Sequence, residues 1–229
     1  MYFLILIVFM ILSFAVSQRL KNKFKKYSRI QMGSGLSGKE IAEQMLYDNG
    51  IQGVSVVSVP GQLTDHYNPA NRTVNLSEEV YHGRSAAAAA VAAHECGHAV
   101  QHAKAYSFLE FRSAMVPIQN ISGKILNIVV LVAMFGGMAF LGVGMESVLL
   151  IIIACYTVLT LFSLVTLPVE FDASKRALAW IEQRGVASPS EYGMAKDALK
   201  WAAMTYVVAA LGSLVTLLYF IFAFLGSRD

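Results

Sequence analysis

Long apolar windows alternate with polar segments along this chain. Four windows carry no charged residue and consist mostly of apolar side chains: residues 1–18, 125–145, 147–169 and 201–227. A helix needs about 20 mainly apolar residues, and about 17 at the short end, to cross a hydrocarbon core of about 30 Å. The pattern therefore predicts four transmembrane helices. Only Glu146, within a glycine-containing turn, separates the second from the third, so these two are expected to form a hairpin.

The polar segment after the first window has the pattern of a small α+β domain. Ser37-Gly38-Lys39-Glu40 is a capping box that opens a short amphipathic helix over residues 41–48. A valine-rich stretch at residues 53–59 predicts a strand. A polar loop is expected at residues 63–71, and a second short strand at residues 72–76.

An alanine-rich run from Ser85 to Ala105 predicts a helix that carries the sequence His94-Glu95-Cys96-Gly97-His98. On a helix, both imidazoles leave one face about a turn apart, so they can hold one tetrahedral Zn²⁺. Glu95 is turned by about 100° from His94 and is free to take a proton from zinc-activated water. In the alternative, the polar side chains only pack in a core, where each unsatisfied group costs about 1 to 3 kcal/mol. The pattern favours zinc binding.

A catalytic zinc site needs a third protein ligand. Glu170 is the preferred candidate because it directly follows the third apolar window, where Pro168 suits a helix start. The alternative is an acidic residue that only marks the end of a span. Asp172 is the second candidate ligand, but on a helix it points about 200° away from Glu170, so the two should not share one metal. His102 continues the histidine face of the motif. The alternative is a fourth ligand that closes the site, but one helix rarely supplies three ligands to one ion, so His102 is expected to support the site or face the substrate. One Zn²⁺ per chain is predicted.

Composition and charge agree with a membrane protein. The 229 residues are 56% hydrophobic and only 14% charged, whereas about a quarter of the residues of a soluble domain are charged. A basic cluster at residues 19–29 follows the first window, and no positive charge precedes that window, which argues against a cleaved signal peptide. By the positive-inside rule the cluster stays in the cytoplasm. Of the 18 Lys and Arg residues, only Arg228 then falls outside.

Several other residues have a candidate role. His66 and Tyr67 are candidates for stabilising an oxyanion, although a polar loop also leaves both simply exposed to solvent. The strand candidate at residues 73–76 is either an edge that accepts an extended substrate or a strand that closes a small sheet. Cys96 is expected to pack as a small apolar side chain. Nucleic acid is not expected as a partner, because the aromatic residues gather in the spans.

Three segments carry a resemblance to a known family. They are residues 93–102 around the histidine motif, residues 58–69 (Ser-Val-Pro-Gly-Gln-Leu-Thr-Asp-His-Tyr-Asn-Pro) and residues 167–174 (Leu-Pro-Val-Glu-Phe-Asp-Ala-Ser). Over nearly its whole length the chain resembles the YugP-type neutral zinc metallopeptidases, which are bacterial membrane proteins.

The resemblance implies a gluzincin-like site, with zinc on His94, His98 and Glu170 and with Glu95 as the general base. One departure is clear. Many gluzincins have an aspartate four residues after the ligand glutamate, where this chain has Ser174. A serine is a weaker partner for orienting His94.

These patterns predict a mainly α membrane protein with four transmembrane helices and a small α+β, zincin-like cytoplasmic domain. The expected segments are transmembrane helix 1 (1–18), the zincin-like domain (19–124), the transmembrane hairpin (125–169), a cytoplasmic helical segment with the third zinc ligand (170–200) and transmembrane helix 4 (201–227). The predicted function is a zinc metalloendopeptidase of the bacterial plasma membrane that hydrolyses peptides or membrane proteins at the cytoplasmic surface of the lipid bilayer. The alternative is a non-catalytic, zinc-stabilised membrane adaptor.

Overall fold

The computed structural model describes residues 2–134 and 144–226 and is mainly helical. The chain divides into two compact units. The first unit contains Met1–Phe14, Phe111–Leu167 and Tyr206–Asp229, and the second contains Ala15–Glu110 and Pro168–Thr205. Four helices run through both units, so each unit is built from several separate parts of the sequence.

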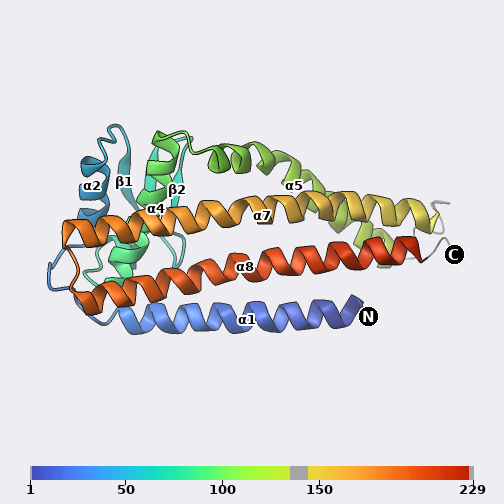
Figure 1. The fold of residues 1–229 in the computed structure, drawn as a ribbon, viewed down its shortest axis with the longest axis horizontal. Coiled ribbons are helices and arrows are strands. Elements are labelled where there is room, and N and C mark those ends of the chain that lie inside the picture. Colours follow the sequence, from blue (N-terminus) through green and yellow to red (C-terminus); the bar gives the residue numbers. More distant parts are fainter. Residues whose placement is uncertain (1, 135–143, 227–229) are drawn as a thin grey trace. The chain divides into compact units, whose positions relative to one another are not determined.

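Among the described residues, four helices are long and apolar enough to cross a membrane. They are α1 (Tyr2–Tyr27), α5 (Ser107–Met134), α7 (Met145–Arg184) and α8 (Pro189–Leu225), and Figure 1 shows them as the long ribbons. The structure therefore contains the four helices that the apolar windows predict. Their bounds extend well beyond the windows, because the polar ends of these helices continue into the second unit.

The connection between the second and third apolar windows falls partly outside the described residues. The expected turn at residues 142–147 begins at positions that the structure does not describe, and its last part is already helical, since α7 begins at Met145.

In the first unit, α1 packs against α8: the rings of Tyr2 and Tyr219 are stacked with centroids 5.6 Å apart. Aromatic side chains therefore help to hold these two helices together.

The expectation that Pro168 begins a helix is wrong. Pro168 lies inside α7, which continues without a break from the apolar window to Arg184. Proline removes one backbone donor and crowds the preceding turn, which a long helix held by its neighbours tolerates. As a consequence, a single helix carries both the third apolar window and Glu170.

At the start of α8, Ser188 and Glu191 form a reciprocal cap. Ser188 N donates to the Glu191 carboxylate (2.6 Å), and Glu191 N donates to Ser188 Oγ (3.4 Å).

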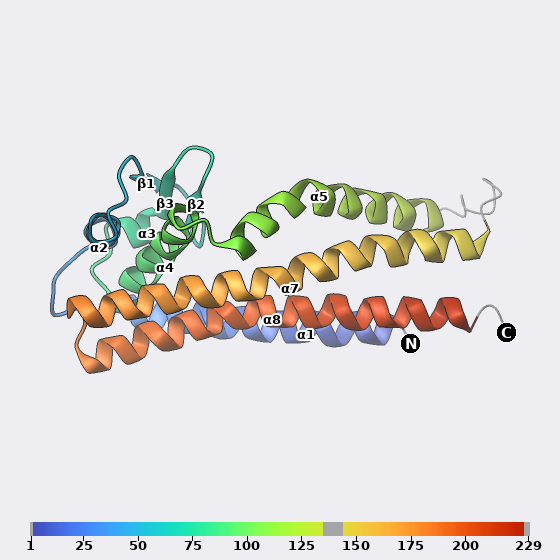
Figure 2. The ribbon, with the colours of Figure 1, turned by 45° about the horizontal axis from the view of Figure 1, so that its top comes forward.

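A small sheet with helices around it forms the rest of the second unit (Figure 2). The predicted capping box is present at the start of α2, because Ser37 Oγ accepts from Glu40 N while Glu40 accepts from Ser37 N. The remaining elements are α2 (Gly38–Asp48), β1 (Ser55–Val59), β2 (His66–Asn68), β3 (Thr73–Ser77), α3 (Glu78–Tyr81) and α4 (Ala86–Ala103). The first predicted strand and the alanine-rich helix are thus both found.

The strand order is β1-β3-β2. β3 pairs in parallel with β1 and antiparallel with β2, so the strand at residues 73–76 lies in the centre of the sheet and is not the substrate-accepting edge, which was one of its two predicted roles. The segment expected as a polar loop contains β2, an edge strand in which Tyr67 pairs with Val74. Asn68 Oδ1 accepts from the backbone N–H of Ala70 and Asn71, which reverses the chain after β2. Val74 is fully buried, as expected for a central strand.

Helix α4 lies at the centre of the second unit, and most of its residues are buried. Its alanines and Gly97 leave room for neighbouring backbones to approach closely. A methyl group built on Gly97 would lie 2.5 Å from the carbonyl oxygen of Ala173 in α7. The next residue in the motif, Cys96, is also buried, and its thiol lies 3.5 Å from the Ala42 carbonyl oxygen, so it packs rather than facing the histidine side of the helix. Burial raises the pKa of the Cys96 thiol far above its usual range.

We expect Gly97→Ala to lower the free energy of unfolding by about 1 to 3 kcal/mol, because over-packing forces the α4 and α7 backbones apart. Thermal unfolding of the detergent-solubilised protein measures the effect. Gly193→Ala is the matched control: Gly193 is exposed in α8, and no atom lies within 4 Å of an added methyl group. The control should be neutral or stabilising by up to about 1 kcal/mol. Equal stability of both variants would contradict the close α4–α7 approach.

Candidate metal centre

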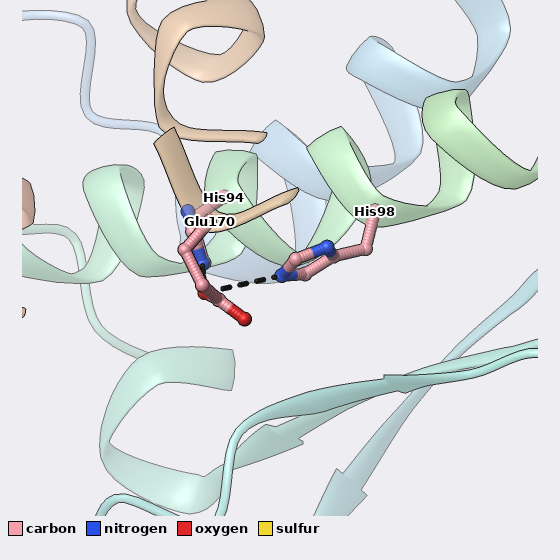
Figure 3. Close-up of side chains that lie close together, drawn as sticks. All are labelled: His94, His98 and Glu170. Atoms are coloured by element: carbon pink, nitrogen blue, oxygen red, sulfur yellow. Dashed lines mark ion pairs between the residues drawn. The ribbon is translucent and has the colours of Figure 1, made fainter. Parts of the chain in front are cut away.

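Helices α4 and α7 bring three potential metal ligands together. His94 and His98 lie a turn apart on α4, and Glu170 faces them from α7 (Figure 3). The Oε2 atom of Glu170 lies 3.3 Å from Nε2 of His94 and 3.6 Å from Nε2 of His98. One ligand atom from each residue can be chosen so that all lie within 4.8 Å of one another. Two imidazole nitrogens and a carboxylate oxygen are a donor set that suits zinc.

The buried carboxylate and the two imidazoles stabilise each other electrostatically. Glu170 is only 2% exposed. Burial alone opposes its ionisation, but hydrogen bonds from His94 and His98 hold the pKa of its carboxyl well below the usual range. Burial also opposes protonation of His98, while Glu170 and the charge of Glu95 raise the pKa of its imidazole above the ordinary value. The site thus favours an ionised Glu170 carboxylate that faces the imidazoles of His94 and His98.

Each histidine uses its other ring nitrogen in a second hydrogen bond. His98 Nδ1 lies 3.0 Å from Gln101 Oε1, and His94 Nδ1 lies 3.2 Å from Ser174 Oγ. A carbonyl oxygen can only accept a hydrogen bond, so Gln101 fixes a proton of His98 on Nδ1. Nε2 is then the ring nitrogen that can bind a metal. Ser174 stands where many gluzincins have an aspartate, and its hydroxyl does reach His94.

Gln101 is a residue of the site that the sequence pattern did not reveal. Its side chain is fully buried. Its amide nitrogen donates to the Val169 carbonyl and to Asp172 Oδ2, each at 2.8 Å. Gln101 therefore links His98 on α4 to the α7 segment that carries Glu170. Its position three residues after His98 puts the two side chains on one helix face, but its partners in α7 are not visible from that spacing.

Asp172 is placed away from the two histidine Nε2 atoms. Its Oδ2 atom accepts from Gln101 and from Arg176 Nε, the latter at 2.5 Å. Of the two acidic candidates for the third ligand, the structure brings Glu170 to the histidines. Asp172 instead holds Gln101 and so acts on the site indirectly.

Glu95 is oriented by the edge strand of the sheet. Its Oε2 atom accepts from the backbone N–H of Tyr67 at 3.0 Å. The Tyr67 hydroxyl lies 2.8 Å from His102 Nδ1, so one residue of β2 contacts two residues of α4. His66 is exposed, and its Nδ1 donates to the carbonyl of Thr64, two residues before it, at 2.8 Å. Tyr67, His102 and Ser174 are thus linked to the motif, whereas the side chain of His66 bonds to the backbone just before β2.

The fold and the site together define a class of protein. The described residues include four helices that are long and apolar enough to cross a membrane, and a His-His-Glu cluster that can hold a metal. The chain belongs to the family described as "Putative neutral zinc metallopeptidase", whose model matches residues 2–225. It is 41% identical over 219 residues to "Putative membrane protease YugP" of Bacillus subtilis (strain 168), covering 95% of this chain and 94% of that relative. The resemblance inferred from the sequence is confirmed. No solved structure matches the chain.

We expect Glu170→Ala and His98→Ala to lose most of the zinc that the purified wild-type protein retains, because each removes one of three donors. Gln101→Ala should weaken zinc binding by about 10- to 100-fold, since the orientation of His98 is lost. Metal content after dialysis against a chelator of known affinity measures both effects.

Asp172→Asn is the matched control, because an amide oxygen still accepts from Gln101 and no donor to the metal is removed. It should keep zinc close to the wild-type level. Full zinc in Glu170→Ala would show that the third ligand lies elsewhere.

Proposed function

We propose that this protein is a zinc endopeptidase that cleaves peptide bonds at the cytoplasmic surface of the plasma membrane. The observation that supports it best is the placement of Glu95: its carboxylate is held by the Tyr67 N–H directly beside the cluster of His94, His98 and Glu170. Membership of a zinc metallopeptidase family and identity to a relative named as a membrane protease support the same reaction class.

His94, His98 and Glu170 are the residues that would hold one Zn²⁺. When bound, zinc supplies a Lewis acid that activates a peptide carbonyl and a water molecule for reaction. The hydrogen bond that His98 Nδ1 donates to Gln101 Oε1 and the hydrogen bond between His94 Nδ1 and Ser174 Oγ keep both imidazoles turned toward Glu170. This chain thus fixes its donor atoms through contacts between α4 and α7.

Glu95 acts as general base and then as general acid. A carboxylate has two oxygens, and the Tyr67 N–H holds only Oε2, so the other oxygen can take a proton from water. The water oxygen adds to the peptide carbonyl carbon, and the proton held by Glu95 passes to the amide nitrogen as the C–N bond breaks. The backbone donor fixes which carboxylate oxygen receives the proton.

Tyr67 is the better placed of the two predicted oxyanion-stabilising residues. Its hydroxyl pairs with His102, which lies on the same side of α4 as Glu95. An extended peptide would bind along β2, which is the sheet edge beside α4, instead of along the central strand β3. Tyr67 would then lie next to the peptide bond that is cleaved.

The zincin-like domain, as we propose it, comprises residues 19–124 together with the segment 170–200. The basic cluster at residues 19–29 keeps this part of the chain in the cytoplasm by the positive-inside rule. Glu170 directly follows the apolar window of α7 on the same helix. At a rise of about 1.5 Å per residue it would lie within a turn of the membrane boundary, so the substrates would be membrane proteins or peptides at the bilayer surface.

We expect Glu95→Gln to retain zinc and to lose cleavage by about 10²- to 10⁴-fold, the usual contribution of a general base. Zinc content and hydrolysis of an unbiased peptide mixture, followed by mass spectrometry, measure the two properties in one preparation. Glu43→Gln on the exposed side of α2 is the control and should cleave like the wild type. Wild-type cleavage by Glu95→Gln would remove Glu95 from this role. A protein that binds zinc but never cleaves would instead fit the adaptor function.

We expect a membrane-impermeant maleimide to label Met145→Cys in intact cells and Glu43→Cys only after permeabilisation. Met145 begins α7 at the predicted external end and is 70% exposed, whereas Glu43 lies on the cytoplasmic domain. The native thiols Cys96 and Cys155 are 0% and 5% exposed and should give little background. The opposite labelling pattern would reverse the proposed orientation.

A further inference from the structure

A cavity adjoins the candidate active site within the same unit. It has a volume of about 490 Å³ and is lined by the loop after α2, by the β2–β3 region and by the C-terminal half of α4. Such a volume is in the range of small-ligand sites. The residues that line it include Ile51, Val54 and Ala99 as well as the Tyr67 and His102 pair. One lining residue, Tyr67, thus also donates to Glu95 through its backbone N–H.

The charge around this cavity is positive. Arg72 and Lys104 both line it, together with the polar residues His102, Asn49 and Gln52. None of its twelve lining residues, all in the described part of the chain, is acidic. Neither Arg72 nor Lys104 forms an ion pair with another residue among positions 2–134 and 144–226. Two cations with no acidic partner thus share one pocket with several neutral hydrogen-bond donors.

The backbone at Arg72 is in an uncommon conformation. Its φ angle is 52°, in the left-handed region that non-glycine residues rarely adopt. The residue lies between β2 and β3, in a short reversal that glycine or asparagine would enter more easily. An arginine at this position therefore lowers the stability of the fold. Its charged side chain is the functional reason for the strained backbone.

The cavity lies at a defined distance from the catalytic position. Ala99, His102 and Ala103 follow Glu95 by four, seven and eight residues, so they continue the same side of α4. With a rise of about 1.5 Å per residue, His102 is about 10 Å further along the helix. An extended peptide covers that distance in about three residues. A side chain of a bound peptide can thus reach the cavity while a bond beside Glu95 is cleaved.

We propose that this cavity is a substrate subsite for a carboxylate, and that the enzyme prefers an Asp or Glu side chain about three residues to one side of the cleaved bond. The inference rests on the proposed peptidase function and adds the substrate class to it. Arg72 and Lys104 bind the carboxylate. The apolar lining residues Ile51, Val54 and Ala99 accommodate the methylene groups of the acidic side chain.

The test compares peptides that carry Glu or Gln at successive positions around one cleavable bond, all with amidated C-termini. For the wild-type protein we expect kcat/KM to be about five- to tenfold higher with Glu at one position, mainly through KM, because this part of the substrate does not change charge in the reaction. The preference should shrink as salt rises. Equal rates for Glu and Gln at every position would overturn the proposal.

Arg72→Gly is the most informative variant, because glycine adopts the left-handed backbone without strain while the charge is removed. We expect unchanged or higher thermal stability and wild-type zinc content, but a Glu-over-Gln preference reduced to about twofold or less. Arg72→Glu should prefer Lys over Glu at the same position. Lys39→Ala, which removes a cation outside the cavity, is the control and should keep the wild-type preference. Retained preference in Arg72→Gly and Arg72→Glu would contradict a role for Arg72.

A peptide's own C-terminus is a second source of the same chemical group. If cleavage requires a free C-terminal carboxylate about three residues from the bond, and internal Glu residues have no effect, the pocket recognises chain ends and the stated side-chain preference is wrong.

Failure of the peptidase function is distinguished by binding. Zinc-loaded Glu95→Gln is titrated with fluorescent Glu and Gln peptides, and anisotropy gives both Kd values without any turnover. Tighter binding of the Glu peptide, lost in the Arg72→Gly background, supports the subsite even if the wild type cleaves nothing. Equal binding of both peptides overturns the subsite even if the wild type is an active peptidase.

Discussion

The arrangement of the second unit depends on one buried carboxylate. Glu170 on α7 is almost fully buried, and an ionised carboxylate without partners would be very costly there. His94 and His98 supply those partners from α4. Helix α7 must therefore stay against α4, and the missing side chain of Gly97 is what lets the two backbones come close enough. The ligand geometry and the helix packing are consequences of the same contact.

This contact joins parts of the chain that are far apart in sequence. Between His98 and Glu170 lie all of α5 and the apolar part of α7, so their association closes a long loop and costs chain entropy. Gln101 adds to the closure by holding His98, Val169 and Asp172 together. A metal held by the same three ligands would strengthen a connection that the side chains already make. Metal binding would therefore be coupled to the folding of this unit.

Local signals predicted much of the structure, and long-range contacts account for what they missed. The capping box at Ser37 and the histidine spacing on an alanine-rich helix act within one or two turns and can be seen in the sequence. Strand β2 has only three residues, and its pairing is decided by β3, so its sequence looked like a loop. The importance of Gln101 depends on Val169 and Asp172 in another helix, and spacing along one helix cannot reveal it.

The short strand β2 explains how a three-stranded sheet can serve a helical site. Tyr67 pairs with Val74, and at this register its N–H points away from β3 and toward Glu95. A slip of one residue would turn that donor into the sheet and leave the carboxylate without it. The same residue places its hydroxyl on His102 at the wall of the cationic cavity. The register of β2 against β3 thus orients both the proposed general base and the proposed recognition pocket, and a change in that register would disturb catalysis and substrate choice together.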